Sequence, residues 1–231
     1  GLCLLAAALM LLHGLFSLPR GGIISMLVIL FSLGLTLPLS GRTRIVFSCT
    51  LLALLGGYGM LLGFDTVIDR FNSIDQSGLG RMKVYLASLP MLGDHWLTGI
   101  GLGSYDLLSP VALKGMPAAI HFDHAHNEYL EFAVELGLPA TLLLFAWLGA
   151  AMFAAGRGLH RLSGSSLRQA PATMVGIAAF SALLGLFVHG WADFGWRLPA
   201  NLFYAATLAA LLTVAVESRP AHGRAEREVV P

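Results

Sequence analysis

The sequence predicts an all-α fold, a bundle of membrane-spanning helices, because its residues are unusually apolar and the apolar ones are clustered. Of the 231 residues, 56% are hydrophobic and 12% are charged, and the mean hydropathy is +0.76. Soluble domains have about 25% charged residues, so a soluble core of this size would not need such apolar blocks. A backbone inside lipid must satisfy its polar groups within its own segment, which makes each block a helix.

Six apolar blocks are long enough to cross a bilayer, since a spanning helix needs about 20 mostly apolar residues. They lie at 1–18, 22–39, 45–63, 139–155, 171–190 and 199–216. We interpret residues 1–231 as one membrane domain. The chain opens inside an apolar run, without an initiator Met or a basic signal region, so we expect it to be the C-terminal part of a longer protein.

The basic residues indicate which face of the membrane each connection occupies. Arginines gather in 41–44, in 156–169 and in the tail after the last block, and six spans place these three segments on one face. The positive-inside rule makes that face cytoplasmic. The opposite face then receives the turn near residue 20, the segment 64–138 and the loop 192–198.

The segment 64–138 between the third and fourth predicted spans is too long for an idle connection, because long loops are usually functional or disordered. Apolar residues after Arg81 recur at helical spacing, and Pro90 and Gly93 suggest where this helix ends. The glycine-rich stretch "GDHWLTGIGLGSY" predicts turns. We therefore expect a partly helical segment that carries the site on the outer face.

A second helix is expected from about 125 to 136, directly before the fourth span. Gly137 would end this helix, and Pro139 suits the first turn of the span. This placement puts His126 and Asn127 in the first turn of a surface helix that leads into the membrane.

Titratable residues are concentrated in "HFDHAHNEY", and three interpretations are open. His121, Asp123, His124 and His126 could ligate a metal, although His124 and His126 are two positions apart and would point to different helix faces. The stretch could instead be a solvated, turn-forming loop without a role. Asp123 or His124 is expected near the cap of the helix that follows. In the third interpretation one histidine is a general base, since an unperturbed imidazole titrates at about pH 6.5. His126, with the adjacent Asn127, is the best placed candidate.

Charged residues elsewhere on the outer face add to this candidate site. Arg20 departs from the positive-inside pattern and either snorkels to lipid headgroups or binds a ligand. Arg81 either is a plain surface charge or binds the same ligand as Arg20. Asp193 and Arg197 are four positions apart and either pair with each other or contact substrate. Because guanidinium groups offer several donors to phosphate, two arginines and a histidine at one interface suggest an anionic lipid headgroup as ligand.

Four stretches of the sequence together resemble the C-terminal part of the O-antigen ligase and polymerase superfamily. These are "LPRGG", "SGLGRMKVYLASLPMLGDHWLTGIGLGSY", "DHAHNEYLEFAVELGLPATLLL" and "HGWADFGWRLPAN", in this order, with Pro19 where the family usually has Ser. The resemblance implies a multi-span glycosyltransferase of the bacterial inner membrane that works at the periplasmic face without a metal or other cofactor. Such enzymes move a glycan from an undecaprenyl-diphosphate carrier onto lipid A-core or another glycan hydroxyl, as in lipopolysaccharide biosynthesis.

The resemblance also implies roles for particular residues. Arg20 and Arg81 would hold the diphosphate, and His126 would be the base or positioning group for the acceptor hydroxyl. Asn127 and Asp193 complete the expected substrate-binding set. The alternatives are an O-antigen or exopolysaccharide polymerase, a protein O-oligosaccharyltransferase, or a non-catalytic polysaccharide transporter or export subunit. We expect no nucleic-acid partner, because no basic stripe with interleaved aromatic residues is present.

Overall fold

The computed structural model describes residues 20–47, 49–50, 53, 74–112, 122–163 and 170–217. Every regular element in these ranges is a helix, as the sequence predicts. The predicted span at 1–18, most of the one at 45–63, and His121 lie outside the described residues.

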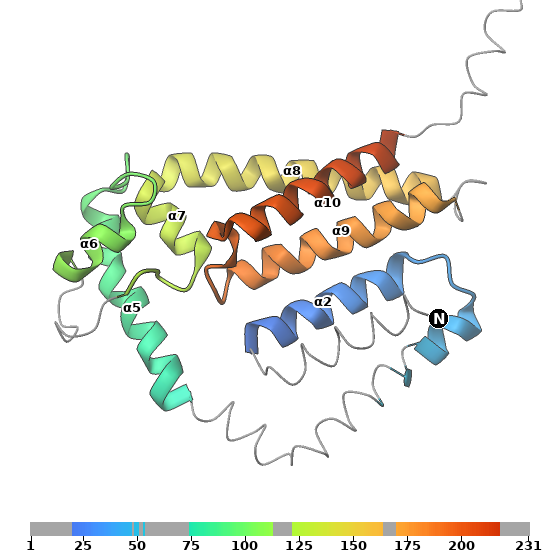
Figure 1. Cartoon of the computed structure of the whole chain (residues 1–231), viewed down its shortest axis with the longest axis horizontal. Helices are drawn as coiled ribbons and strands as arrows, with labels where there is room; N and C mark the ends of the chain where they lie inside the picture. Colours follow the sequence, from blue (N-terminus) through green and yellow to red (C-terminus); the bar gives the residue numbers. More distant parts are fainter. Residues whose placement is uncertain are drawn as a thin grey trace, which may run out of the picture.

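Within the described residues, the bundle is formed by four helices: α2 (Arg20–Thr36), α8 (Leu138–Ser163), α9 (Pro171–Gly190) and α10 (Pro199–Glu217). Figure 1 shows them running side by side, with α9 between α2 and α10. By length and composition, α8, α9 and α10 can cross a membrane, which confirms the last three predicted spans. The apolar part of α2 covers Ile24–Thr36 and is shorter than a span. Six spans are thus not confirmed within the described residues.

Small side chains let these helices approach one another closely. Gly185 of α9 faces Ile29 and the carbonyl of Ser25 on α2, and a Cβ at Gly185 would overlap the Ile29 side chain. About one turn from this contact, Ser32 of α2 and Ser181 of α9 share a hydrogen bond of 2.9 Å. These are the contacts by which helices associate in lipid, where burial of apolar surface gives no driving force. Because α2 and α9 are antiparallel, α2 begins at the end of the bundle where α9 ends.

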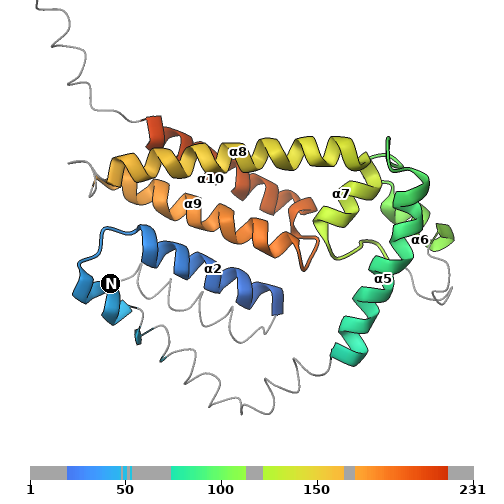
Figure 2. The ribbon, with the colours of Figure 1, turned by 180° about the vertical axis from the view of Figure 1, so that it is seen from behind.

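Three further helices lie at that same end of the bundle (Figure 2): α5 (Ile74–Asp94), α6 (Tyr105–Ala112) and α7 (Glu128–Leu136). Their shared core consists of Met91, Tyr105, Ala125 and Val134. The sequence did not predict α6. It placed the end of α5 near Pro90 or Gly93, whereas the helix continues to Asp94.

The glycine-rich turn after α5 packs against the end of α7. Gly99 and Gly137 have φ angles of 69° and 80°, and a Cβ on either would overlap the backbone of the other segment. Backbone hydrogen bonds join the two segments, from Ile100 N to Val134 O at 3.0 Å and from Leu138 N to Trp96 O at 2.7 Å. The expected end of α7 at Gly137 is therefore confirmed, and glycine is needed there because its φ is positive.

Candidate functional site

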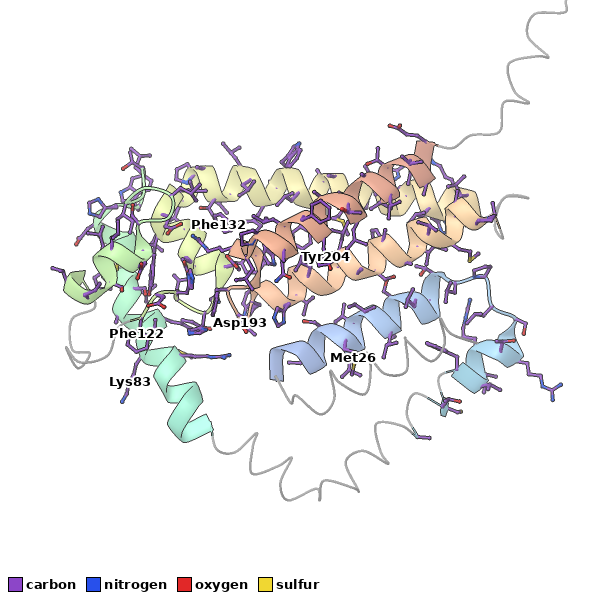
Figure 3. All side chains as sticks on the ribbon, viewed as in Figure 1. Met26, Lys83, Phe122, Phe132, Asp193 and Tyr204 are labelled. Carbon is purple, nitrogen blue, oxygen red and sulfur yellow. The ribbon has the colours of Figure 1, made fainter. Side chains whose placement is uncertain are left out.

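The candidate site lies where α5 and α7 meet the turn between α9 and α10. This turn ends in a 3-10 helix, η2 (Gly195–Arg197), and Figure 3 labels Asp193 in it, at the end of α9 that faces α5 and α7. Two clusters of charged side chains occupy the region. One is buried and surrounds Arg197. The other is partly exposed and surrounds His126.

Arg197 lies between three glutamates of α7. Its Nη1 donates to Glu135 Oε2 at 2.7 Å, and its Nε lies 3.3 Å from Glu128 Oε2 and 3.2 Å from Glu131 Oε1. The three carboxylates share one face of α7, three and four positions apart, and are at most 1% exposed. The guanidinium also stacks over the Phe132 ring, 4.8 Å from its centroid. We name Arg197, Glu128, Glu131 and Glu135 the buried charge cluster.

The expected pairing of Arg197 with Asp193 is wrong. Residues four apart are neighbours only in an α-helix, and 193–197 is a turn followed by a 3-10 helix, so the two side chains diverge. The spacing of Glu128, Glu131 and Glu135 in an otherwise apolar helix was the signal for the true partners.

Burial and charge shift the pKa values of two members of this cluster, Glu128 and Arg197. Burial raises the pKa of Glu128, opposed by the hydrogen bond from Trp196 N and by the charge of Arg197. For Arg197, burial lowers the pKa, but the negative charges of Glu131, Glu135 and Glu128 outweigh burial and the net shift is upward. Arg197 is therefore held in its charged form, and the pKa of Glu128 stays above its ordinary value even beside that positive charge.

His126 precedes α7 instead of lying in its first turn, which corrects the helix start expected from the sequence. Asn127 is the N-cap, and its side chain accepts a hydrogen bond from Leu130 N at 3.1 Å. His126 has a φ of 54°, in the left-handed region, and its carbonyl accepts a hydrogen bond from Tyr85 OH at 3.0 Å. The backbone thus turns sharply at His126 before the helix begins.

The His126 imidazole faces a carboxylate. Its Nδ1 lies 3.4 Å from Asp193 Oδ1, and both side chains are about one third exposed (34% and 35%). Asp193 Oδ1 also accepts a hydrogen bond from Phe194 N at 2.9 Å, and its Oδ2 lies 4.0 Å from His189 Nε2. The hydrogen bond with His126 is the main cause of a lowered Asp193 pKa, so the carboxylate stays ionised. A proton on Nδ1, shared with Asp193, leaves the His126 Nε2 as a proton acceptor.

His124 has a separate carboxylate partner. Its Nδ1 lies 2.8 Å from Glu131 Oε1, and its ring stacks on Phe194 at 4.4 Å between centroids. The edge of the His126 ring packs on the same Phe194, 5.1 Å away. Among the residues that the structure describes, no group of three or more histidine, cysteine, aspartate or glutamate side chains could hold a metal ion.

Helix α5 brings Arg81 to the same place. The exposed Arg81 donates from Nη1 to the carbonyl of Ala192 at 2.9 Å, directly before Asp193. One helical turn later, Tyr85 contacts His126, and burial raises the Tyr85 pKa, opposed by the charge of Arg81 and a hydrogen bond with Asn127. Of the residues singled out from the sequence, Arg81, His126, Asn127 and Asp193 thus lie together. Arg20 begins α2, at the same end of the bundle.

A bundle of apolar helices, of which α8, α9 and α10 are long and apolar enough to cross a bilayer, defines a membrane protein. A family model described as O-antigen ligase matches residues 5–145, which is more than half of the chain, so the protein belongs to the O-antigen ligase family. This is a family of glycosyltransferase-like membrane enzymes, and membership indicates glycan transfer of the O-antigen ligase or polymerase type. The match includes Arg20, Arg81, His126 and Asn127 and ends before Asp193. No curated protein matches the chain significantly.

The buried charge cluster predicts a strong and pH-dependent effect of Arg197→Met. Removing the guanidinium leaves three buried carboxylates without a counter-charge, which should cost about 3–5 kcal/mol of stability. The pKa of Glu128 is already raised by burial, and without the opposing charge of Arg197 its folded-state value rises further above the unfolded one. The variant should therefore be most stable at acidic pH and lose stability as the pH rises through the folded-state pKa of Glu128.

Thermal unfolding of the purified protein in detergent between pH 5 and pH 8 measures this effect. Arg42→Met, at an exposed arginine, is the control and should change little. An Arg197→Met loss that is the same at every pH would contradict the role assigned to the charges.

Proposed function

We propose that the protein transfers a glycan from an undecaprenyl-diphosphate carrier to a hydroxyl of lipid A-core or of another glycan, at the periplasmic face of the bacterial inner membrane. The observation that supports this most is the His126–Asp193 contact beside Arg81, in a chain of a glycan-transfer family. An imidazole oriented by a carboxylate is suited to take a proton, and a nearby guanidinium is suited to bind phosphate.

His126 acts as the general base in this proposal. Its Nε2 takes the proton of the acceptor hydroxyl as that oxygen attacks the anomeric carbon of the donor. The bond from the anomeric carbon to the diphosphate oxygen breaks, and the bonding electrons leave with undecaprenyl diphosphate. Asp193 holds the imidazole through Nδ1 and stabilises the imidazolium that forms. The step balances with no added metal or cofactor.

Arg81 binds the diphosphate and stabilises the charge that develops on it as it leaves. Its hydrogen bond to Ala192 uses one of five guanidinium N–H groups and fixes the side chain beside Asp193. Arg20 supplies the second phosphate contact from the start of α2. In this proposal Asn127, which caps α7, also contacts the acceptor next to His126.

The proposed sidedness predicts which residues a membrane-impermeant thiol reagent reaches. With Cys3 and Cys49 replaced by Ser, Leu107→Cys on α6 should be labelled in intact spheroplasts, because α6 lies at the site end. Arg161→Cys, near the end of α8, should be labelled only after the membrane is opened. Both positions are exposed, so burial does not protect either from the reagent. The reverse pattern would place the site in the cytoplasm and reject the periplasmic reaction.

Substitutions at His126 and Asp193 should slow glycan transfer and leave carrier binding unchanged. His126→Ala should lower the turnover number by about 10²–10⁴-fold, the usual range for a positioned acid or base. Asp193→Asn should also lower turnover, because an amide no longer selects the imidazole tautomer. Asp94→Asn, at the exposed end of α5, is the control. The assay follows glycan transfer from the purified undecaprenyl-linked donor to lipid A-core, free glycan or a peptide acceptor.

The acceptor that receives glycan in this assay separates a ligase from a polymerase and from a protein O-oligosaccharyltransferase. A His126→Ala variant with full transfer activity would exclude the base role. If the unmodified protein transfers to no acceptor yet binds the donor, the non-catalytic alternative replaces the proposal.

Arg81 should contribute to donor affinity as well as to turnover. Arg81→Lys should restore little of the activity lost in Arg81→Ala, because an ammonium does not reproduce the planar, multi-donor guanidinium. Lys83→Ala, two positions along α5 and also exposed, is the matched control and should keep donor affinity. Donor titrations that give equal affinity for Arg81→Ala and the unmodified protein would remove Arg81 from the diphosphate site.

A further inference from the structure

A groove is lined by the C-terminal turns of α8 and by the last turn of α10. Figure 1 shows that these helix ends lie at the end of the bundle opposite α7. It has a volume of about 400 Å³, in the range of small-ligand sites. Its lining residues are Phe153, Ala154, Arg157, Gly158, Arg161, Leu162 and Val216. The proposed transfer reaction uses none of them.

Two arginines supply the polar part of this groove. Arg157 and Arg161 are one helical turn apart on the same face of α8, and both are exposed. Within the described ranges, neither forms an ion pair with a carboxylate, whereas Arg197 has three such partners. Like charges one turn apart repel each other, so an anion held between the two guanidiniums would stabilise this end of α8.

The rest of the groove is apolar. Phe153 and Val216 line it from α8 and α10, and the Arg157 guanidinium lies over the Phe153 ring, 5.8 Å from its centroid. Gly158 lets α10 come close, since a Cβ there would overlap Val216. A free inorganic anion would use only the arginines, but a phospholipid would use both parts of the groove.

We propose that this groove binds one anionic phospholipid, with the phosphate between Arg157 and Arg161 and the first part of an acyl chain against Phe153 and Val216. Basic pockets between spanning helices are suited to such headgroups. The site requires only that α8 and α10 end at a membrane boundary, so it does not depend on the transfer reaction. Under the proposed sidedness the lipid belongs to the cytoplasmic leaflet.

The test compares lipids on the purified full chain in detergent. Phosphatidylglycerol should raise the melting temperature, and native mass spectrometry should retain one bound molecule, while phosphatidylcholine and inorganic phosphate should do neither. The double variant Arg157→Gln/Arg161→Gln should lose both effects. The control variant is Arg42→Gln/Arg44→Gln, which removes the same amount of charge from an exposed helical segment, 41–47, at this end of the bundle. It should still bind phosphatidylglycerol and still be stabilised by it.

A second variant tests the apolar part without changing any charge. Ala154 is exposed and lines the groove, so Ala154→Phe should fill the space, keep the fold and lose the bound phosphatidylglycerol. Retention of the lipid by both groove variants would overturn the proposal. Equal loss of the lipid in the Arg42/Arg44 control would also overturn it, because that result indicates a general attraction to basic residues. Equal stabilisation by inorganic phosphate would overturn it as well, because that result indicates an anion site without a lipid.

Discussion

The guanidinium of Arg197, enclosed by three carboxylates of α7, is the interaction on which the geometry of the site depends. Each glutamate offers one oxygen to Arg197 and the other to a backbone N–H group of a different segment. These second hydrogen bonds come from Trp196 at 2.7 Å, Ala125 at 2.8 Å and Tyr105 at 3.1 Å, to Glu128, Glu131 and Glu135 in turn. One face of α7 thereby holds the turn before α10, the chain before α7 and the start of α6 in fixed positions.

The main effect of such a cluster is to fix the positions of the segments around it, and its net contribution to the free energy of unfolding is small. Buried ion pairs are often no more stabilising than apolar residues of similar volume, because removing charges from water is expensive. What the cluster provides is register: Arg197 and Trp196 are fixed on α7, so Asp193 and Phe194, a few residues earlier in the same turn, are held against His126. We interpret His124 as part of the same arrangement, since it joins Glu131 to the Phe194 ring.

The sequence predicted the apolar helices well because their signal is local. The block 171–190 coincides with α9, whose start is marked by Pro171 and whose residues are apolar on every side. The cap of α7 was misplaced because Asp, Asn and neighbouring polar residues are nearly equivalent caps in sequence, and tertiary contacts choose between them. The partners of Arg197 were missed for a similar reason: which carboxylates become buried is decided by segments about 60 to 70 residues away in the chain.

The left-handed backbone at His126 makes protein stability and the proposed catalytic activity favour different residues at this position. A side chain with a Cβ is strained in this conformation by about 1–2 kcal/mol, and glycine is not. The strain is borne by a residue whose imidazole is proposed to do the chemistry, as is common where a backbone is held in place by its surroundings. Random mutagenesis selected for thermal stability alone should therefore drift toward glycine here, and selection for glycan transfer should restore histidine.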